Sequence, residues 1–331
     1  MTIERTILSI LWNSLETSST GNIISSFYAL PDTGKGGLEI IGANLFRVDD
    51  KLANDWADSV SYRDFCNPKH QRRDLGGDER IEQRFHHFLQ DTDSIDHAKY
   101  NFKRVLQFVI EGEDAVSRVV RLVGDIRQRR GDTVFGKFGD YQTTSDGRIT
   151  YIKFPVYAPS SASQAEHQIG LFWLEHHSLG GINQHVLRGC QDYGQTVVLI
   201  KPHAFHTYDY DARWGDILDR FSRANSSTIA AKVFTFTRAQ LDQFYSSKAH
   251  EPWYEQEFVP QMTRGRTLAI LYEGPNIQRA IREALLEVVR PEFQDKYDPG
   301  KTAAHASDPK EHGSVEREKY VVGFDDNLLP L

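Results

Sequence analysis

The pattern His-x-Ser occurs twice near the C-terminal end of the chain, and it raises the question of which histidine, if either, does chemistry. The first occurrence is His305-Ala306-Ser307 and the second is His312-Gly313-Ser314. An imidazole acts as a nucleophile through one ring nitrogen when a hydrogen bond to the other nitrogen fixes the tautomer. The two histidines are therefore the first candidates for a catalytic side chain.

A lysine in the second half of the chain is also placed where chemistry is expected. Residues 196–200 form a continuous apolar run that predicts a strand, and Pro202 then turns the chain away, so Lys201 stands at the strand terminus. A lysine in such a place often meets phosphate. Residues 31–37 (PDTGKGG) resemble a phosphate loop only superficially, because they lack the Gly-x-x-x-x-Gly-Lys-Ser/Thr order. Lys201 is the better phosphate candidate.

Two clusters invite a metal interpretation, and neither has the spacing of a known site. His167, His176 and His177 fall on one predicted helix with His185 beyond it, but adjacent histidines point to different helix faces and no carboxylate completes a ligand set. A cluster of aspartates precedes a predicted helix, where acidic residues more often cap free amides: Asp91, Asp93 and Asp96. We therefore expect no metal held by the protein.

The composition limits the class of protein that holds these residues. The chain has 331 residues, of which 39% are hydrophobic, enough for two domains. Its net charge of -7, with 39 basic and 46 acidic residues mixed along the chain, gives no basic stripe for nucleic acid. The two cysteines, Cys66 and Cys190, lie far apart, which favours a reducing compartment. Without a signal peptide or a run of about 18 apolar residues, we expect a cytoplasmic protein that does not bind membranes.

The first half of the chain mixes β-prone and helical patterns. Short apolar runs separated by Ser, Gly and Pro predict strands over residues 6–12, 22–30 and 38–48. Apolar residues at helical spacing predict helices over residues 102–109 and 116–123. A hairpin is expected around Ser145-Asp146-Gly147, and Ser163 with Glu166 has the spacing of a capping box. We expect an α+β domain with a helical middle.

The second half predicts a more regular order of elements. Strands are expected over residues 196–200, 228–236, 267–272 and 320–324. Helices are expected over residues 213–223, 237–245, 253–262 and 276–288, the second opened by a capping box of Thr237 and Gln240. The order β-α-β-β-α-β is that of a ferredoxin-like domain with a four-stranded antiparallel sheet.

A turn-rich break at residues 189–195 separates the two halves. It predicts an α+β domain of unassigned role over residues 1–190 and a ferredoxin-like domain over residues 194–331. No internal repeat is evident between them.

Several motifs of the second half, taken together, resemble the nucleoside diphosphate kinase family. VVLIKPHAF is similar to the family's first strand, and HASDPKE is similar to its histidine signature. The stretch from Leu241 to Arg282 resembles the middle of the family, with its tyrosine, its Lys-x-x-x-Pro-aromatic run and its Glu-Gly-x-Asn. The resemblance covers the C-terminal half alone. It implies a ping-pong transfer in which a histidine takes the γ-phosphoryl group of a nucleoside triphosphate, with Mg²⁺, and passes it to a diphosphate.

The resemblance also decides between the two histidines. Measured from His305, Ser307, Asp308 and Glu311 fall at the family's offsets and Glu318 follows at nearly the spacing of its tautomer-fixing glutamate, whereas His312 lacks the aspartate. His305 is thus the expected nucleophile, with Lys201 on the transferred phosphate and Glu318 behind the imidazole. The nucleotide-binding residues that the resemblance implies are Tyr245 near the histidine, Trp253 on the base, Arg282 and Arg290 on phosphates, and Thr302 and Ser307 beside the histidine.

The chain also departs from the family. The segment between Arg282 and Arg290 is shorter, and Thr302, Ala306 and His203 replace an asparagine, a glycine and an aspartate. Because that segment holds phosphate and joins subunits in the family, we expect weaker nucleotide binding and a homo-oligomer smaller than a hexamer. The alternative to a kinase-like phosphotransferase is a catalytically degenerate nucleotide-binding or assembly module, fused to an N-terminal domain that carries the activity.

Overall fold

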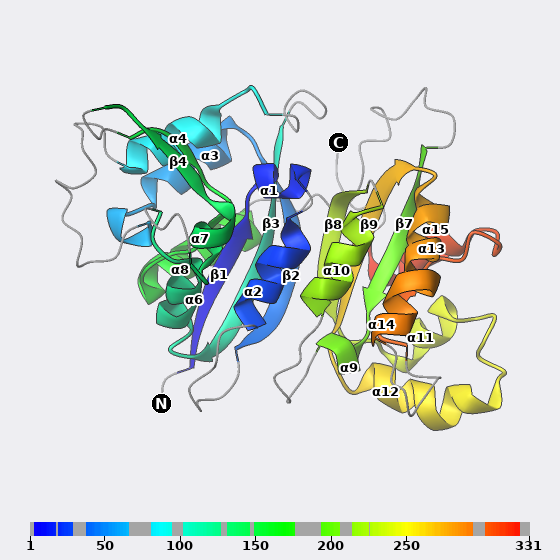
Figure 1. Cartoon of the computed structure of the whole chain (residues 1–331). Coiled ribbons are helices and arrows are strands. Elements are labelled where there is room, and N and C mark those ends of the chain that lie inside the picture. The colour runs from blue at the N-terminus through cyan, green and yellow to red at the C-terminus, as the bar shows by residue number, and fades with distance from the viewer. Residues whose placement is uncertain are drawn as a thin grey trace. The chain divides into compact units, whose positions relative to one another are not determined.

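A computed structural model describes most of the chain: residues 3–17, 19–28, 38–65, 81–94, 102–126, 131–145, 149–175, 193–205, 214–224, 226–293 and 302–324. The chain forms two compact units (Figure 1). Unit 1 comprises Met1–Ser19, Ala29–Ile41 and Phe46–Ser178, and unit 2 comprises Thr20–Tyr28, Gly42–Leu45 and Leu179–Leu331. Outside the described residues lie the stretch 31–37, Cys66, Cys190, Asp96, His176, His177 and His185.

Unit 1 is organised by a four-stranded sheet of order β2-β3-β1-β6. The strands are β1 (Ile3–Ile10), β2 (Glu39–Val48), β3 (Lys103–Glu113) and β6 (Val156–Tyr157). The α-helices are α1 (Trp12–Glu16), α3 (Asp50–Asp58), α4 (Ile81–Gln90), α6 (Ala115–Val123), α7 (Val134–Phe138) and α8 (Ala162–Gly170). The predicted hairpin is β4 (Asp140–Thr143) paired antiparallel with β5 (Ile149–Lys153). Both α6 and α8 pack on β1.

Three predictions in the first half were wrong. Residues 22–30 were expected as a strand, but α2 (Thr20–Tyr28) is a helix. Residues 102–109 were expected as a helix, but they fall in β3, whose side chains are buried along nearly its whole length. A strand covered on both faces is apolar without alternation, so helical spacing arises in it by chance. The cap of α8 is Ser161, which accepts a hydrogen bond from the Gln164 amide, rather than Ser163.

Unit 2 contains the ferredoxin-like arrangement that the sequence predicted. Its antiparallel sheet has the order β10-β7-β9-β8. The strands are β7 (Tyr193–Ile200), β8 (Ser227–Phe234), β9 (Thr267–Pro275) and β10 (Ala304–Ala306). The α-helices are α2, α9 (Pro202–Phe205), α10 (Trp214–Ser222), α11 (Arg238–Phe244), α12 (Val259–Thr263), α13 (Ile277–Ala284), α14 (Arg290–Phe293) and α15 (Ser314–Val322). The capping box of Thr237 and Gln240 is formed at the start of α11.

The fourth strand of this sheet is not where it was predicted. Residues 320–324 were expected as a strand, but α15 runs to Val322 and ends at Gly323, whose φ of 80° is left-handed. An apolar run as short as Tyr320 to Phe324 does not distinguish a strand from the last turn of a buried helix. The fourth strand is β10 instead, and it carries His305 at its centre.

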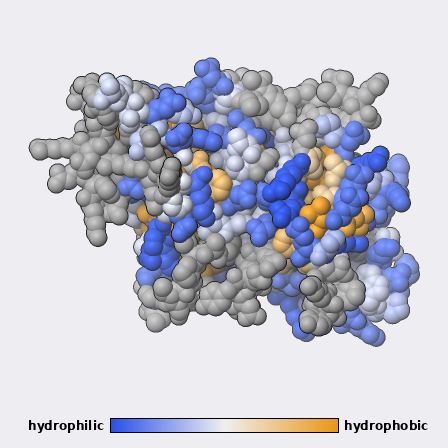
Figure 2. Space-filling model, viewed as in Figure 1, coloured by the Kyte–Doolittle hydropathy of each residue, from blue (hydrophilic) through white to orange (hydrophobic). Residues whose placement is uncertain are grey.

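One core cluster of unit 2 lies between its sheet and the helices α11, α12 and α15. It includes fully buried residues from β7, β9 and those helices, among them Leu199, Leu271, Leu241, Met262 and Val322. The coloured surface in Figure 2 is mainly hydrophilic, with hydrophobic residues confined to small areas. Among the described residues no helix is long and apolar enough to cross a bilayer.

Candidate active site

A pocket of about 310 Å³ lies in unit 2, beside the end of β7 and the strand β10. Lysine and arginine side chains outnumber the carboxylates in its lining. The cations are Lys201, Lys248, Arg282, Arg290 and Arg317. The carboxylates are Asp308, Glu311 and Glu318. Such a lining suits a ligand with several negative charges, because each fixed cation offers charge-assisted hydrogen bonds to an oxyanion.

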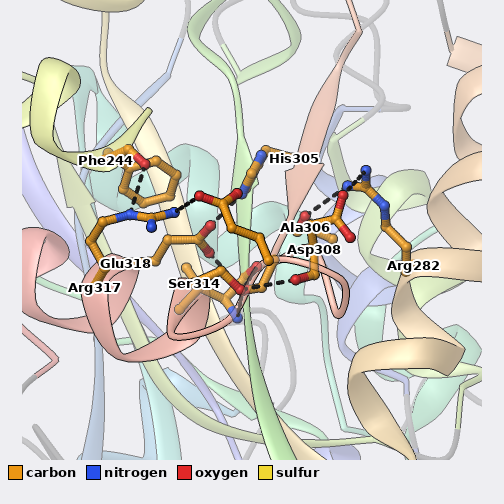
Figure 3. A network of polar contacts seen from close by, with 11 residues as sticks. Phe244, Arg282, His305, Ala306, Asp308, Ser314, Arg317 and Glu318 are labelled. Carbon is orange, nitrogen blue, oxygen red and sulfur yellow. Dashed lines mark hydrogen bonds and ion pairs between the residues drawn. The ribbon is translucent and has the colours of Figure 1, made fainter. Parts of the chain in front are cut away.

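His305 is held at the wall of this pocket by a buried glutamate (Figure 3). Its Nε2 lies 3.0 Å from Glu318 Oε1, and the second carboxylate oxygen of Glu318 accepts a 2.6 Å hydrogen bond from Ser307 Oγ. The Glu318 side chain is only 2% exposed, whereas that of His305 is 17% exposed. An ionised carboxylate only accepts, so Nε2 carries the proton and Nδ1 keeps its lone pair. His305 can therefore act as a nucleophile through Nδ1.

Two aromatic rings fix the plane of the imidazole. The rings of Phe244 and Tyr245 both lie edge-on to His305, with centroid distances of 5.2 Å. The buried Tyr245 hydroxyl has no hydrogen-bond partner among the described residues. Burial and the nearby Glu318 carboxylate raise the pKa of Tyr245 well above its usual value, so the hydroxyl stays protonated and can donate. It is available to a bound group.

Lys201 is buried at the end of β7, where the sequence placed it. Its Nζ donates a 2.7 Å hydrogen bond to Thr302 Oγ1 and lies 5.1 Å from the centre of the Phe258 ring. Its backbone amide donates to the Ala303 carbonyl at 3.0 Å, which joins the end of β7 to the segment before β10. Burial first, and the Arg290 guanidinium second, lower the pKa of Lys201 to about 7.

Arg282 of α13 and Arg290 of α14 differ in their partners. Arg282 donates to the Ala306 carbonyl at 3.0 Å and to Asp308 at 3.1 Å, as Figure 3 shows. Arg290 has a buried Nε with no partner among the described residues, and burial together with nearby Arg282 lowers its pKa. The Arg290 guanidinium therefore disfavours the charged form of Lys201, as the Arg282 guanidinium does that of Arg290. An anion between them would relieve that repulsion.

The structure brings most of the residues named from the sequence into one place. Lining the pocket are His305, Lys201, Glu318, Tyr245, Trp253, Arg282, Arg290 and Thr302. Ser307 is fully buried and lies behind Glu318, outside the lining. His312 is exposed in the turn before α15 and is also outside the lining. Trp253 stands 41% exposed, against the Phe258 ring at 5.6 Å.

Sequence reasoning missed Arg317 and Phe258. Arg317 bonds Glu311 at 2.9 Å and the Phe244 carbonyl at 3.3 Å, so it ties α15 to the end of α11. Only the chain fold brings these residues together, and no local pattern reveals them. The described residues contain no group of three His, Cys, Asp or Glu side chains that could hold a metal ion.

Comparison with known proteins places the second half of the chain. A family model for nucleoside diphosphate kinase matches residues 194–322. The nucleoside diphosphate kinase of Aquifex aeolicus is 30% identical over 134 residues, 37% of this chain and 89% of that protein. The enzyme of Coxiella burnetii is 31% identical over 131 residues, 37% of this chain and 86% of that protein. An orthorhombic crystal structure of the Aquifex aeolicus enzyme is 28% identical over 39% of this chain and 94% of that one, with a TM-score of 0.33. The N-terminal half has no match.

Proposed function

The chain belongs to the nucleoside diphosphate kinase family through residues 194–322, and we propose that it moves a phosphoryl group from a nucleoside triphosphate to a nucleoside diphosphate or related phosphorylated acceptor. His305 is the carrier. The observation that supports this most is the hydrogen bond from His305 to buried Glu318, in a pocket lined mainly by cations.

The transfer needs one nucleophilic nitrogen and a fixed tautomer. Glu318 holds the proton on Nε2 of His305, so Nδ1 forms a bond to the γ-phosphorus as the bond from that phosphorus to the β,γ-bridging oxygen breaks. The nucleoside diphosphate leaves with that oxygen. A second diphosphate then attacks the phosphohistidine, and the imidazole departs in its original tautomer.

The surrounding side chains supply charge and position. Lys201, Arg282 and Arg290 stabilise the charge on the equatorial phosphoryl oxygens, and the Tyr245 hydroxyl donates to the same group. Trp253 stacks on the base of the nucleotide at the pocket wall. This contact does not select among bases, because every base has a flat face. Mg²⁺ reaches the pocket on the nucleotide phosphates, where it neutralises part of their charge.

We also propose a cytoplasmic homo-oligomer smaller than a hexamer. The support is the segment between Arg282 and Arg290, which is continuous helix through α13, the π-helical Leu285–Val289 and the start of α14. It leaves no loop there to reach another subunit.

The test is phosphorylation of the protein itself. We expect label from γ-³²P-ATP and Mg²⁺ to be acid-labile and base-stable in the intact chain, and to disappear in His305→Ala because the only held imidazole of the pocket is gone. The matched control is His312→Ala, an exposed histidine seven positions along, which should keep the label.

Two results would decide against the proposal. Label that survives in His305→Ala and vanishes in His312→Ala would reverse the choice of histidine. A chain that binds ATP by calorimetry but takes no label and exchanges none with a diphosphate would be the degenerate module instead.

A further inference from the structure

The sheets of the two units have the same strand order. Unit 1 reads β2-β3-β1-β6, and unit 2 read from its other edge is β8-β9-β7-β10. The helices occupy the same intervals of the chain: α2 and α10 follow the first strand, α6 and α13 the third, and α8 and α15 the last. A shared order alone is common among unrelated proteins with this fold, so finer agreement is needed.

The strand registers supply that agreement. In both sheets the first and third strands pair antiparallel over eight residues, and the end pairs are Ile3 with Glu113 and Ile10 with Leu106 in one, Tyr193 with Pro275 and Ile200 with Leu268 in the other. The residue after the first strand bonds the carbonyl before the last strand in each: Leu11 to Pro155 at 3.2 Å and Lys201 to Ala303 at 3.0 Å.

The turn after the third strand repeats as well. The two strands end in Glu111-Gly112-Glu113 and Glu273-Gly274-Pro275, and Asp114 and Asn276 follow at the same position. Their φ angles are 52° and 50°, and they are the two non-glycine residues with positive φ in the described part of the chain. Left-handed backbone is rare outside glycine, so its appearance at equivalent positions is a specific point of agreement between the two halves.

We infer that the first half of the chain is a second copy of the unit 2 fold, and that its catalytic positions have been replaced. The register that sets His305 opposite Leu199 sets Tyr157 opposite Ser9, so Tyr157 stands where the histidine stands. Like His305 against Phe244, Tyr157 has an edge-on aromatic neighbour in Trp56, at 5.4 Å.

The rest of the reactive set is missing from the first copy. Leu11 stands for Lys201, and the last helix bonds Tyr157 through two neutral amides, Gln168 at 2.8 Å and Gln164 at 3.3 Å, where Glu318 bonds His305. Tyr157 is also bonded to Asp64 at 2.7 Å, and both are buried. The first copy therefore holds neither a nucleophilic imidazole nor a phosphate-binding lysine at these positions.

Helix α2 of the first copy packs on α10 of the second, inside unit 2, and the contact is self-complementary. Both helices are nine residues long and begin one residue before a glycine, so Gly21, Asn22 and Ser25 match Gly215, Asp216 and Asp219. The hydrogen bonds are crossed: Asn22 to Asp219 at 2.8 Å and Ser25 to Asp216 at 2.5 Å. Crossed pairing of equivalent residues is what a two-fold relation between the two helices of this contact produces.

The α2 face and the α10 face of this contact differ in charge. Every member of the crossed pairs on α10 is an aspartate, and every member on α2 is a neutral donor. Two α10 helices paired the same way would set Asp216 against Asp219 twice, with like charges in contact. The face of α10 is thus fitted to one partner, the α2 helix of the same chain.

The inference is tested by exchanging the two faces in the intact chain. We expect Asn22→Asp with Ser25→Asp to lower Tm by several degrees, because four carboxylates then meet. Adding Asp216→Asn and Asp219→Ser, which moves the aspartates to the other helix, should recover the greater part of that loss. Gln243→Glu with Gln256→Glu adds the same charge at exposed positions and should leave Tm nearly unchanged.

Each outcome decides, and none depends on whether His305 is phosphorylated. If the Tm of the quadruple variant is lower than that of the double variant, the two contacts are not equivalent and the duplication is contradicted at this interface. If the double variant of α2 were as stable as the control with two added glutamates, α2 would not pack on α10. Should the double variant not fold, Ser25→Asp with and without Asp216→Ser gives the same comparison for one hydrogen-bonded pair.

Discussion

The pKa of Lys201 makes the pocket sensitive to pH. With a pKa of about 7 in place of 10.5, the lysine is largely neutral above neutrality, and it must take up a proton to bind phosphate. We therefore expect nucleoside diphosphate affinity to fall by up to about tenfold per pH unit between pH 7.5 and 9, since one proton is bound with the ligand. Calorimetry in buffers of different ionisation enthalpy measures that proton directly.

Lys201→Arg is the matched control, because a guanidinium keeps its charge throughout this range. Its affinity should be nearly flat from pH 7.5 to 9. An intact chain whose affinity is equally flat would mean that Lys201 is already charged in the free pocket.

Most of the pocket could be predicted from the sequence, because two of its residues stand in recognisable local patterns. The spacing of the residues after His305 and the strand that ends at Lys201 are visible in the sequence. The resemblance to the family then added Arg282, Arg290 and Tyr245. Arg317 and Phe258 could not be predicted, because they reach the pocket only through the packing of elements that are distant in the sequence. Ser307 was expected to touch nucleotide, yet its hydroxyl is used on Glu318.

At the scale of elements, the sequence failed where burial outweighs local preference. Residues 22–30 contain isoleucine and aromatic residues, which favour a strand, but residues 22–28 lie in α2, which packs on α10. The capping box of α11 was predicted correctly since both of its partners are local. The duplication itself was not evident, because the two copies share strand registers and left-handed turns but only scattered residue types, such as the Glu-Gly pair before the turn.

The glycines of the α2–α10 contact give a test at this scale. A Cβ at Gly21 would lie 2.6 Å from the Gly215 carbonyl oxygen, and one at Gly215 would lie 2.8 Å from the Gly21 carbonyl oxygen. Backbone cannot yield as a flexible side chain does, so we expect Gly21→Ala and Gly215→Ala each to cost about 1–3 kcal/mol of unfolding free energy.

Gly170→Ala is the control for those variants. An added Cβ there meets nothing within 4 Å and the residue is helical without positive φ, so stability should be unchanged or slightly raised. Urea unfolding measures all three. Loss at Gly21 alone, with Gly215→Ala as stable as the control, would contradict a mirrored contact.

At the scale of the whole molecule, the domain boundary near residue 194 remains a prediction that α2 complicates. All four strands of the unit 2 sheet lie between residue 193 and the C-terminus, but α2, from far upstream, adds a helix to the same unit. A fragment of residues 193–331 should therefore fold around its own sheet and yet expose one face of α10. Asp219 on that face is only 4% exposed in the intact chain.

We expect this fragment to unfold at a lower temperature than unit 2 does within the intact chain, and to stay monomeric at that face. The crossed pairing would place Asp216 against Asp219 of another copy, and like charges in contact oppose association. Replacing them, as Asp216→Asn with Asp219→Ser, removes the repulsion and leaves the glycines free to meet, so in sedimentation velocity this fragment should reach a larger assembly than the unaltered one does. A fragment as stable as the intact chain, or a substituted fragment no larger than the unaltered one at high concentration, would mean that the acidic face does not select α2.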